Sequence, residues 1–189
     1  MRVVISVRDQ VMARFGNQLT ALGAGKANLA LRRAMNHTGA KAKTQVSRAL
    51  TTQTGLPRKT IVRAVRVLNA SVANLSFALE TKGGDISLKY FKARETRQGV
   101  SAAPWNKRKV YPSTFTKGGR FPKRKALRKG KGHVFARAGA GRLPIKKQKS
   151  GLYIPREMVQ GQTKDAWDRL IVADLLPRVR HEVARMLPK

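Results

Sequence analysis

The 189-residue chain contains no cysteine, which excludes a disulfide scaffold, a zinc site with thiolate ligands and a cysteine nucleophile. Long apolar runs are also missing. The N-terminal run of residues 2–7 is closed by Arg8 and Asp9 and is too short for the core of a signal peptide. No stretch approaches the roughly 18 apolar residues that a membrane span requires. We therefore expect a protein that is neither exported nor inserted into a membrane.

Acidic residues are scarce as well. The chain has 9 Asp and Glu against 41 Lys and Arg, which gives a formal net charge of +32. Residues 82–149 hold 21 of the basic residues and only 2 acidic ones, Asp85 and Glu95. Such a segment repels itself, and solubility alone needs a net charge of only about 2–8. We expect it to lie against something anionic, either nucleic acid or an acidic protein surface.

The sequence offers little for catalysis. The three histidines are isolated from one another and show no metal-binding spacing. Neither Gly-Lys pair is followed by the Ser or Thr of a nucleotide-binding P-loop. Asp85 and Glu95 could form a catalytic pair or hold magnesium, as in a nuclease, but ion pairing with neighbouring Lys or Arg is the simpler interpretation. We expect no enzymatic activity, no cofactor and no metal site.

Apolar periodicity predicts an α+β fold, with N-terminal amphipathic helices packed on an antiparallel β-sheet and a kinked C-terminal helix. Residues 27–49 form the longest predicted helix, in which alanines make a small-residue seam and which the run 51–55 ends. Thr163 is the predicted cap of the C-terminal helix, and Pro177 should kink or divide it. Asp9 is the predicted N-cap of a further helix that runs to residue 22. The remaining expected elements are strands at 2–7, 61–68, 72–81, 86–91, 133–137 and 152–154, and a hairpin turn at 83–85.

Residues 92–132 mix glycine, proline and cations with few apolar anchors, which predicts a long basic loop or arm within a single domain spanning residues 1–189. Four aromatic side chains interleave with the charges, and they could either stack on bases or pin the segment to the core or to a neighbouring subunit. The predicted residues for binding nucleic acid or an acidic partner are Lys107, Arg108, Lys109, Arg120, Lys123, Arg124, Lys125, Arg128, Lys129, Lys131, Arg137 and Arg142.

Several segments together resemble the prophage minor tail protein Z family, the tail-completion proteins of lambda-like phages. They are LRRAMNHTGAKA at 31–42, GLPRKTI at 55–61, and RAGAGRLPI at 137–145 followed by GLYIP at 151–155. The order of elements, the length and the basicity agree over nearly the whole chain.

The resemblance implies a structural minor tail or tail-completion protein of the virion, made in the host cytoplasm and acting at the head-proximal end of the tail. It implies a homo-oligomeric ring, expected to be a hexamer. The implied partners are the tail terminator, the connector, and the tail tube or tape measure protein. The basic arm would contact a neighbouring ring or the end of the genome DNA without reading its sequence.

The main alternative is a non-specific nucleic-acid-binding protein of ribosomal or nucleoid type. It predicts salt-sensitive binding by the isolated monomer, with a log–log slope of roughly −0.9 per neutralised phosphate on duplex DNA. No helix-turn-helix, zinc-finger or RRM signature supports sequence-specific recognition. Two long helices with apolar seams favour the assembly protein, because small ribosomal proteins commonly devote less sequence to packing on themselves.

Overall fold

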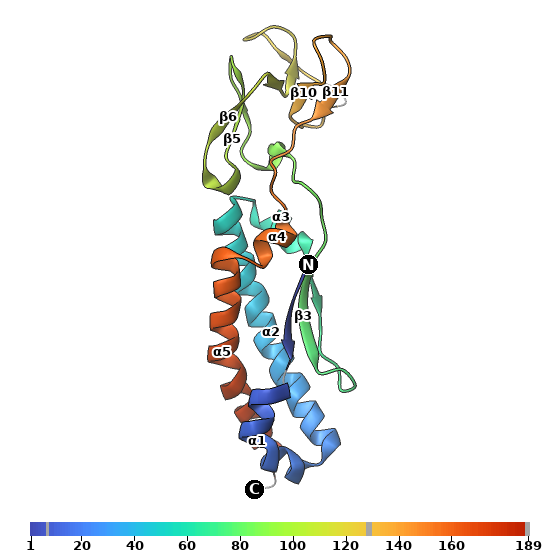
Figure 1. Cartoon of the computed structure of the whole chain (residues 1–189), viewed down its shortest axis with the longest axis vertical. Coiled ribbons are helices and arrows are strands. Elements are labelled where there is room, and N and C mark those ends of the chain that lie inside the picture. Colours follow the sequence, from blue (N-terminus) through green and yellow to red (C-terminus); the bar gives the residue numbers. More distant parts are fainter. Residues whose placement is uncertain (7, 128–129, 188–189) are drawn as a thin grey trace.

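The computed structural model describes residues 1–6, 8–127 and 130–187. The molecule is long and narrow, with helices at one end and short strands at the other (Figure 1). We call the first part, formed by the described residues of 1–81 and 152–187, the helical body. We call the second part, formed by the described residues of 86–150, the distal lobe. The α+β class predicted from the sequence is confirmed.

Three helices form most of the helical body: α1 (Arg8–Leu22), α2 (Ala24–Thr54) and α5 (Gly161–Ala184). α2 and α5 pack against each other along much of their length (Figure 1). Of the alanines predicted to form the seam, Ala27, Ala34 and Ala42 are buried, whereas Ala49 is only partly buried. Side chains this small let neighbouring backbones approach closely. α2 ends at Gly55, whose φ of 74° is the left-handed conformation that glycine adopts without strain.

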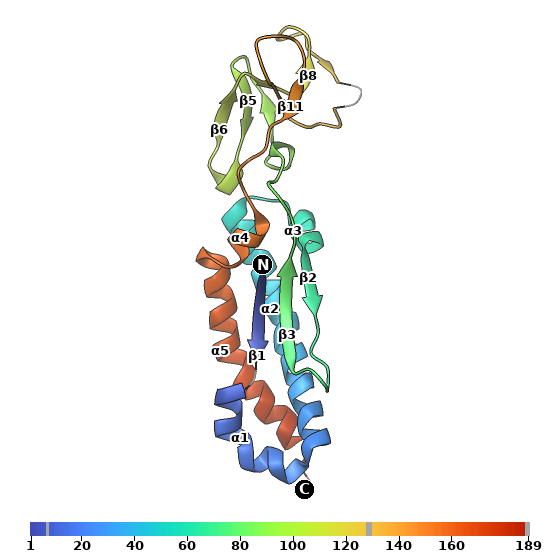
Figure 2. The same cartoon turned by 45° about the vertical axis from the view of Figure 1, so that its right-hand side comes forward.

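A three-stranded antiparallel sheet lies against α2 (Figure 2). Its strands are β1 (Arg2–Ser6), β2 (Val65–Leu68) and β3 (Ser76–Thr81), in the order β1-β3-β2. The inner face buries Phe77, whose ring lies over Gly39 of α2. A Cβ atom at Gly39 would be 2.4 Å from that ring, so only glycine allows this contact.

Two short helices, α3 (Arg58–Ala64) and α4 (Ile154–Met158), lie at the end of the body that faces the lobe (Figure 2). Two chain segments then connect body and lobe, and they pair with each other. The Ile86 amide donates to the Leu152 carbonyl at 3.0 Å, and the Ser150 amide donates to the Ile86 carbonyl at 2.9 Å. The Asp85 carboxylate accepts from the Gly151 amide at 2.8 Å and holds the two segments together.

The distal lobe consists of short strands in small sheets, ordered β4-β5-β6, β11-β10-β7 and β8-β9. Leu88, Phe91, Val100 and Val134 form its small core. The strands are β4 (Arg94–Glu95), β5 (Gly99–Ala102), β6 (Lys109–Pro112), β7 (Thr114–Phe115), β8 (Lys117–Gly118), β9 (Lys125–Ala126), β10 (Phe135–Arg137) and β11 (Ile145–Lys147), with 3-10 turns η1 (Leu88–Tyr90) and η2 (Pro104–Asn106).

Several local predictions are wrong. Residues 61–64 belong to α3, residues 88–90 form η1, and residues 83–85 connect body and lobe and make no hairpin. The predicted strand at 152–154 gives way to α4, which starts at Ile154. The described residues of 92–132 contain six short strands separated by turns and loops, where a long loop or arm was expected; most of these strands pair with one another, and β7 pairs with β10.

Two predictions about helix ends also need correction. Asp9 is the second residue of α1 and does not precede it. α5 begins at Gly161, so Thr163 lies inside it; the Thr163 amide and hydroxyl both donate to Gln53 Oε1 on α2, at 3.0 and 2.9 Å. Pro177 lies within α5 without dividing it. Among the described residues, none of the helices combines the length and apolar character that crossing a membrane requires.

Candidate anion-binding site

The two carboxylates of the cationic middle segment are both engaged in holding the fold. Asp85 binds the Gly151 amide, as described above. Glu95 accepts from Arg124 Nη1 at 2.6 Å and from the Thr116 hydroxyl at 3.0 Å, and its side chain is only 10% exposed. In the described part of the chain, no three His, Cys, Asp or Glu side chains gather where they could hold a metal ion. The arrangement therefore gives no support to a catalytic pair or a magnesium site at Asp85 and Glu95.

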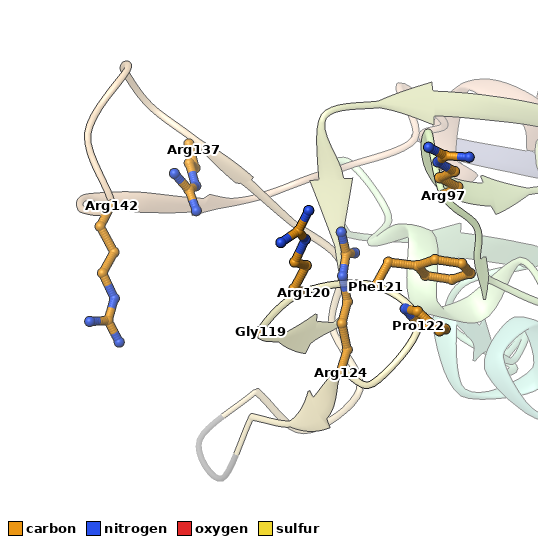
Figure 3. Close-up of a pocket in the computed structure, with 8 residues that line it drawn as sticks. All are labelled: Arg97, Gly119, Arg120, Phe121, Pro122, Arg124, Arg137 and Arg142. Carbon is orange, nitrogen blue, oxygen red and sulfur yellow. The ribbon is translucent and has the colours of Figure 1, made fainter.

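Five arginines line one hollow of about 840 Å³ in the distal lobe (Figure 3). They come from segments far apart in the sequence. Arg97 lies in the turn between β4 and β5, Arg120 and Arg124 in the turn between β8 and β9, Arg137 at the end of β10, and Arg142 in the loop before β11. Gly119, Phe121 and Pro122 complete the lining. We call this the arginine hollow.

Arg124 is the fixed member of the arginine hollow. Its guanidinium is held by Glu95, and its Cζ lies 5.8 Å from the centroid of the Phe121 ring, within the range of a cation–π contact. Among the described residues, no carboxylate forms an ion pair with the other four arginines. Five guanidiniums and one carboxylate leave a local surplus of positive charge. Like charges gathered in one place raise the free energy of the free protein, so the hollow favours a ligand with several negative charges.

A second hollow of about 590 Å³ adjoins the first and shares Arg97, Arg124, Arg137 and Arg142 with it. Its lining adds Lys117 and apolar side chains, including Leu127, Leu143 and Ile145. The site is therefore a charged hollow with an apolar wall beside it. This combination suits a ligand that has both anionic groups and flat or apolar groups.

The structure brings only some of the predicted binding residues together. Arg120, Arg124, Arg137 and Arg142 meet in the arginine hollow. Arg97 was missed, because it is a single arginine outside the dense basic runs and only the pairing of β4 with β5 places it there. No signal in the sequence alone distinguishes it from other single arginines.

Lys107, Arg108 and Lys109 line neither hollow and follow η2. Arg108 donates to the Ser101 hydroxyl at 3.2 Å, and Lys109 Nζ lies 4.9 Å from the centroid of the Tyr111 ring. These cations are exposed, but they also support the β5–β6 pair.

Three other predicted residues are exposed cations that do not line the hollows: Lys123 and Lys125, near the β8–β9 hairpin, and Lys131. Arg128 and Lys129 lie outside the described residues. The predicted set is thus spread over the lobe and has one dense point, the arginine hollow.

His133 shows how the cations of the lobe act on a titratable group. Its Nδ1 is 2.9 Å from the Ser87 hydroxyl, and its Nε2 is 3.0 Å from Lys89 Nζ. Burial, and then the charges of Lys89, Lys147 and Lys131, lower the pKa of His133 below its ordinary value. The neutral ring therefore accepts from the Lys89 ammonium through Nε2 and donates from Nδ1 to Ser87. His133 serves the packing of the lobe.

Most of the interleaved aromatic side chains pack within the protein. The Trp105 indole donates to Glu157 Oε1 at 3.2 Å and so joins η2 to α4 of the body. Phe115 packs on Phe135, with ring centroids 6.3 Å apart. Tyr111 is partly buried against the core. Phe121 differs, because it lines the arginine hollow and remains 40% exposed.

Family models, curated proteins and solved structures were compared with the chain, and none of the three comparisons gave a match.

Proposed function

We propose that the chain is a non-enzymatic assembly protein of a long-tailed phage or prophage, a minor tail or tail-completion subunit that acts at the head-proximal end of the tail. Its distal lobe would contact an anionic partner there, and its helical body would contact neighbouring subunits and rings. The observation that carries the proposal is the separation of roles along the molecule. Residues 82–149, with 21 basic and 2 acidic residues, project from a helical body that contributes most of the hydrophobic core (Figure 1).

The outer face of the body's sheet supports the proposed contact between subunits. Val4, Ala78 and Leu68 face one another across β1, β3 and β2. Val4 is 45% and Leu68 38% exposed, while the smaller Ala78 between them has no exposed surface. A short apolar row of this kind on a sheet is suited to packing against another protein surface. A hexameric ring would repeat this surface around the tail axis.

Deletion of the coding sequence in the phage or prophage tests the proposal. We expect the resulting particles to lack infectivity and to regain it when the full chain is supplied in trans. Electron microscopy of complemented particles should place the chain at the head-proximal end of the tail, in a closed ring. Particles that lack the chain and remain infectious would refute the proposal.

One observation favours a second candidate, a nucleic-acid-binding protein of ribosomal or nucleoid type. It is the gathering of five arginines around an exposed Phe121. Sedimentation of cell extracts separates the two proposals. Co-sedimentation with ribosomes or chromosome at low salt, released at high salt and independent of any tail protein, would support this candidate against the assembly role.

A further inference from the structure

We propose that the arginine hollow is a binding site for an unpaired nucleic-acid strand, which places consecutive phosphates on the arginines and a base on Phe121. The inference specifies the chemical class of the anionic partner that the distal lobe binds. It rests on the proposed function only for the biological source of the strand, because binding by the purified chain can be measured without any virion.

The arginines specify the charge and shape of the ligand. A guanidinium presents donors in a planar fork that matches a phosphate or a carboxylate, and five of them line the hollow. Its volume of about 840 Å³ far exceeds what a single phosphate ion fills, so the site suits a linked series of anionic groups. A phosphodiester strand supplies such a series along a flexible backbone.

Phe121 distinguishes an unpaired strand from a duplex. The ring is 40% exposed beside the arginines, and Arg124 lies within cation–π distance of it. Aromatic rings of this kind stack on single bases, whereas the bases of a duplex are already stacked on one another. The hollow is also concave, with arginines on several sides, while duplex grooves are usually entered by a protruding helix or strand pair (Figure 3).

The apolar wall next to the arginines fits the same ligand. Leu127, Leu143 and Ile145 line the adjoining hollow, which shares four of the arginines. Leu143 is 72% exposed, so its side chain is accessible to a ligand in this hollow. A strand that lies across both hollows would set bases on the apolar wall and phosphates on the arginines. An acidic peptide would gain little from Phe121.

Fluorescence anisotropy with the full chain and a labelled single-stranded oligonucleotide tests this inference, with a blunt duplex, inorganic polyphosphate and polyglutamate as competitors. The double variant Arg97→Gln, Arg137→Gln should weaken single-strand binding about tenfold or more. It should also reduce the log–log salt slope by roughly 1.4, since each phosphate contact to a single strand contributes about 0.7. The matched control Arg33→Gln, Arg48→Gln removes the same charge from exposed positions on α2 and should change binding less than twofold.

Phe121→Leu tests the stacking contact separately, because it keeps an apolar side chain and removes the aromatic face. We expect it to weaken single-strand binding about fivefold or more, as the loss of a base–aromatic stack does, and to leave polyphosphate binding unchanged. Circular dichroism and thermal unfolding would verify that each variant is folded.

Three results would overturn the inference. The variant of the hollow and the control variant could lose affinity for the single strand equally, which would mean that binding depends on the net charge of the protein and not on the arginine hollow. The duplex could bind as tightly as the single strand with no effect of Phe121→Leu. The substitutions in the hollow could weaken the binding of polyglutamate and leave that of the oligonucleotide unchanged, which would indicate an acidic protein partner. If the substitutions in the hollow weaken strand binding but particles without the chain remain infectious, the binding site is supported and the proposed function is refuted.

Discussion

The helical body forms more ion pairs than the distal lobe does. In the body, Asp174 accepts from Lys41 at 2.5 Å and from Thr38 at 2.8 Å, and so ties α5 to α2. The buried Glu182 accepts from Arg178 at 2.5 Å. In the lobe, two carboxylates face a large excess of cations and are both used to hold the fold. Cations exceed carboxylates in both regions, but the excess is denser in the lobe, since residues 82–149 hold 21 basic and 2 acidic residues and the rest of the chain holds 20 and 7. This is the pattern expected if the lobe packs on an anionic partner.

The two regions also differ in what holds them together. The largest fully buried side chains lie mainly in the body, among them Phe77, Met35 and Leu50, while the lobe contributes Leu88 and Phe91. Short strands with so small a core gain little from apolar burial. The stability of the lobe must therefore depend on polar contacts and on its junction with the body. The predictions below test this difference.

The largest effect should come from the body core. Phe77→Ala removes the ring that packs on Gly39 and should lower the free energy of unfolding by about 3–5 kcal/mol. Chemical denaturation followed by circular dichroism at the helical wavelength would measure it. Binding of a polyanion by the variant at low temperature, where it is still folded, should stay close to that of the wild type. A loss below about 1 kcal/mol would show that the sheet contributes little to the body.

The next effect concerns the junction. Glu157 is buried and accepts from Gln53 Nε2 at 2.6 Å, from the Trp105 indole at 3.2 Å and from Gln160 Nε2 at 3.2 Å. Glu157→Ala leaves these donors without their acceptor and should cost about 2 kcal/mol.

Indole fluorescence measures the junction directly. In a Trp167→Phe background, Trp105 is the remaining tryptophan, and its emission should shift to longer wavelength in Glu157→Ala as the indole gains contact with water. An unchanged emission maximum would contradict the junction role, whatever the change in stability.

A smaller effect is expected inside the lobe. Glu95→Gln removes the charge that pairs with Arg124, whose side chain is 20% exposed, and should cost about 1–2 kcal/mol. Hydrogen exchange should show faster exchange at β4 and β5, with no change in α2 and α5. The matched control Asp168→Asn breaks an exposed pair with Lys164 in α5 and should have a smaller effect on stability than Glu95→Gln. Equal exchange rates in the lobe of Glu95→Gln and the wild type would contradict this expectation.

The helices could be predicted from the sequence because their signal is local. Apolar residues three or four positions apart mark the buried faces of α2 and α5, and the stop at Gly55 needs only one residue in a left-handed conformation. The first strand was predicted to within one residue, at Arg2–Ser6. In each case the residues that determine the element lie within it.

The lobe could not be predicted in the same way. Its strands are two to four residues long, which is too short for an alternating pattern to show. Most of them pair with the next strand along the chain, but β7 pairs with β10 and so joins Phe115 to Phe135. The density of cations marks the region that contains the arginine hollow, and Arg120, Arg124, Arg137 and Arg142 of the predicted set line it. Which arginines converge depends on strand pairing, so the place of Arg97 required the structure.

The smallest predicted effect is a pH dependence located in the lobe. Burial and three lysines lower the pKa of His133, so as the pH falls the unfolded chain, whose histidine has its ordinary pKa near 6.5, takes up a proton before the folded chain does. Stability is therefore complete above the ordinary pKa and falls as the pH drops from there toward the lowered one. His133→Gln keeps a neutral side chain that can accept from Lys89 and donate to Ser87. It should remove the contribution of His133 to the slope of the unfolding free energy against pH.

Urea unfolding at a series of pH values between 7.5 and 5 would measure the slopes. Burial, followed by the charges of Arg178 and Lys41, also lowers the pKa of His37 in the body, so the His133 variant should retain a residual slope. His37→Gln is the matched control, since it should remove the contribution of His37 in the body to this pH dependence and leave the contribution of His133 in the lobe. If hydrogen exchange in β10 of the wild type fails to quicken over this range relative to His133→Gln, the lysines around His133 do not act on it as the geometry indicates. The lobe's excess charge would then be screened by solvent even at His133.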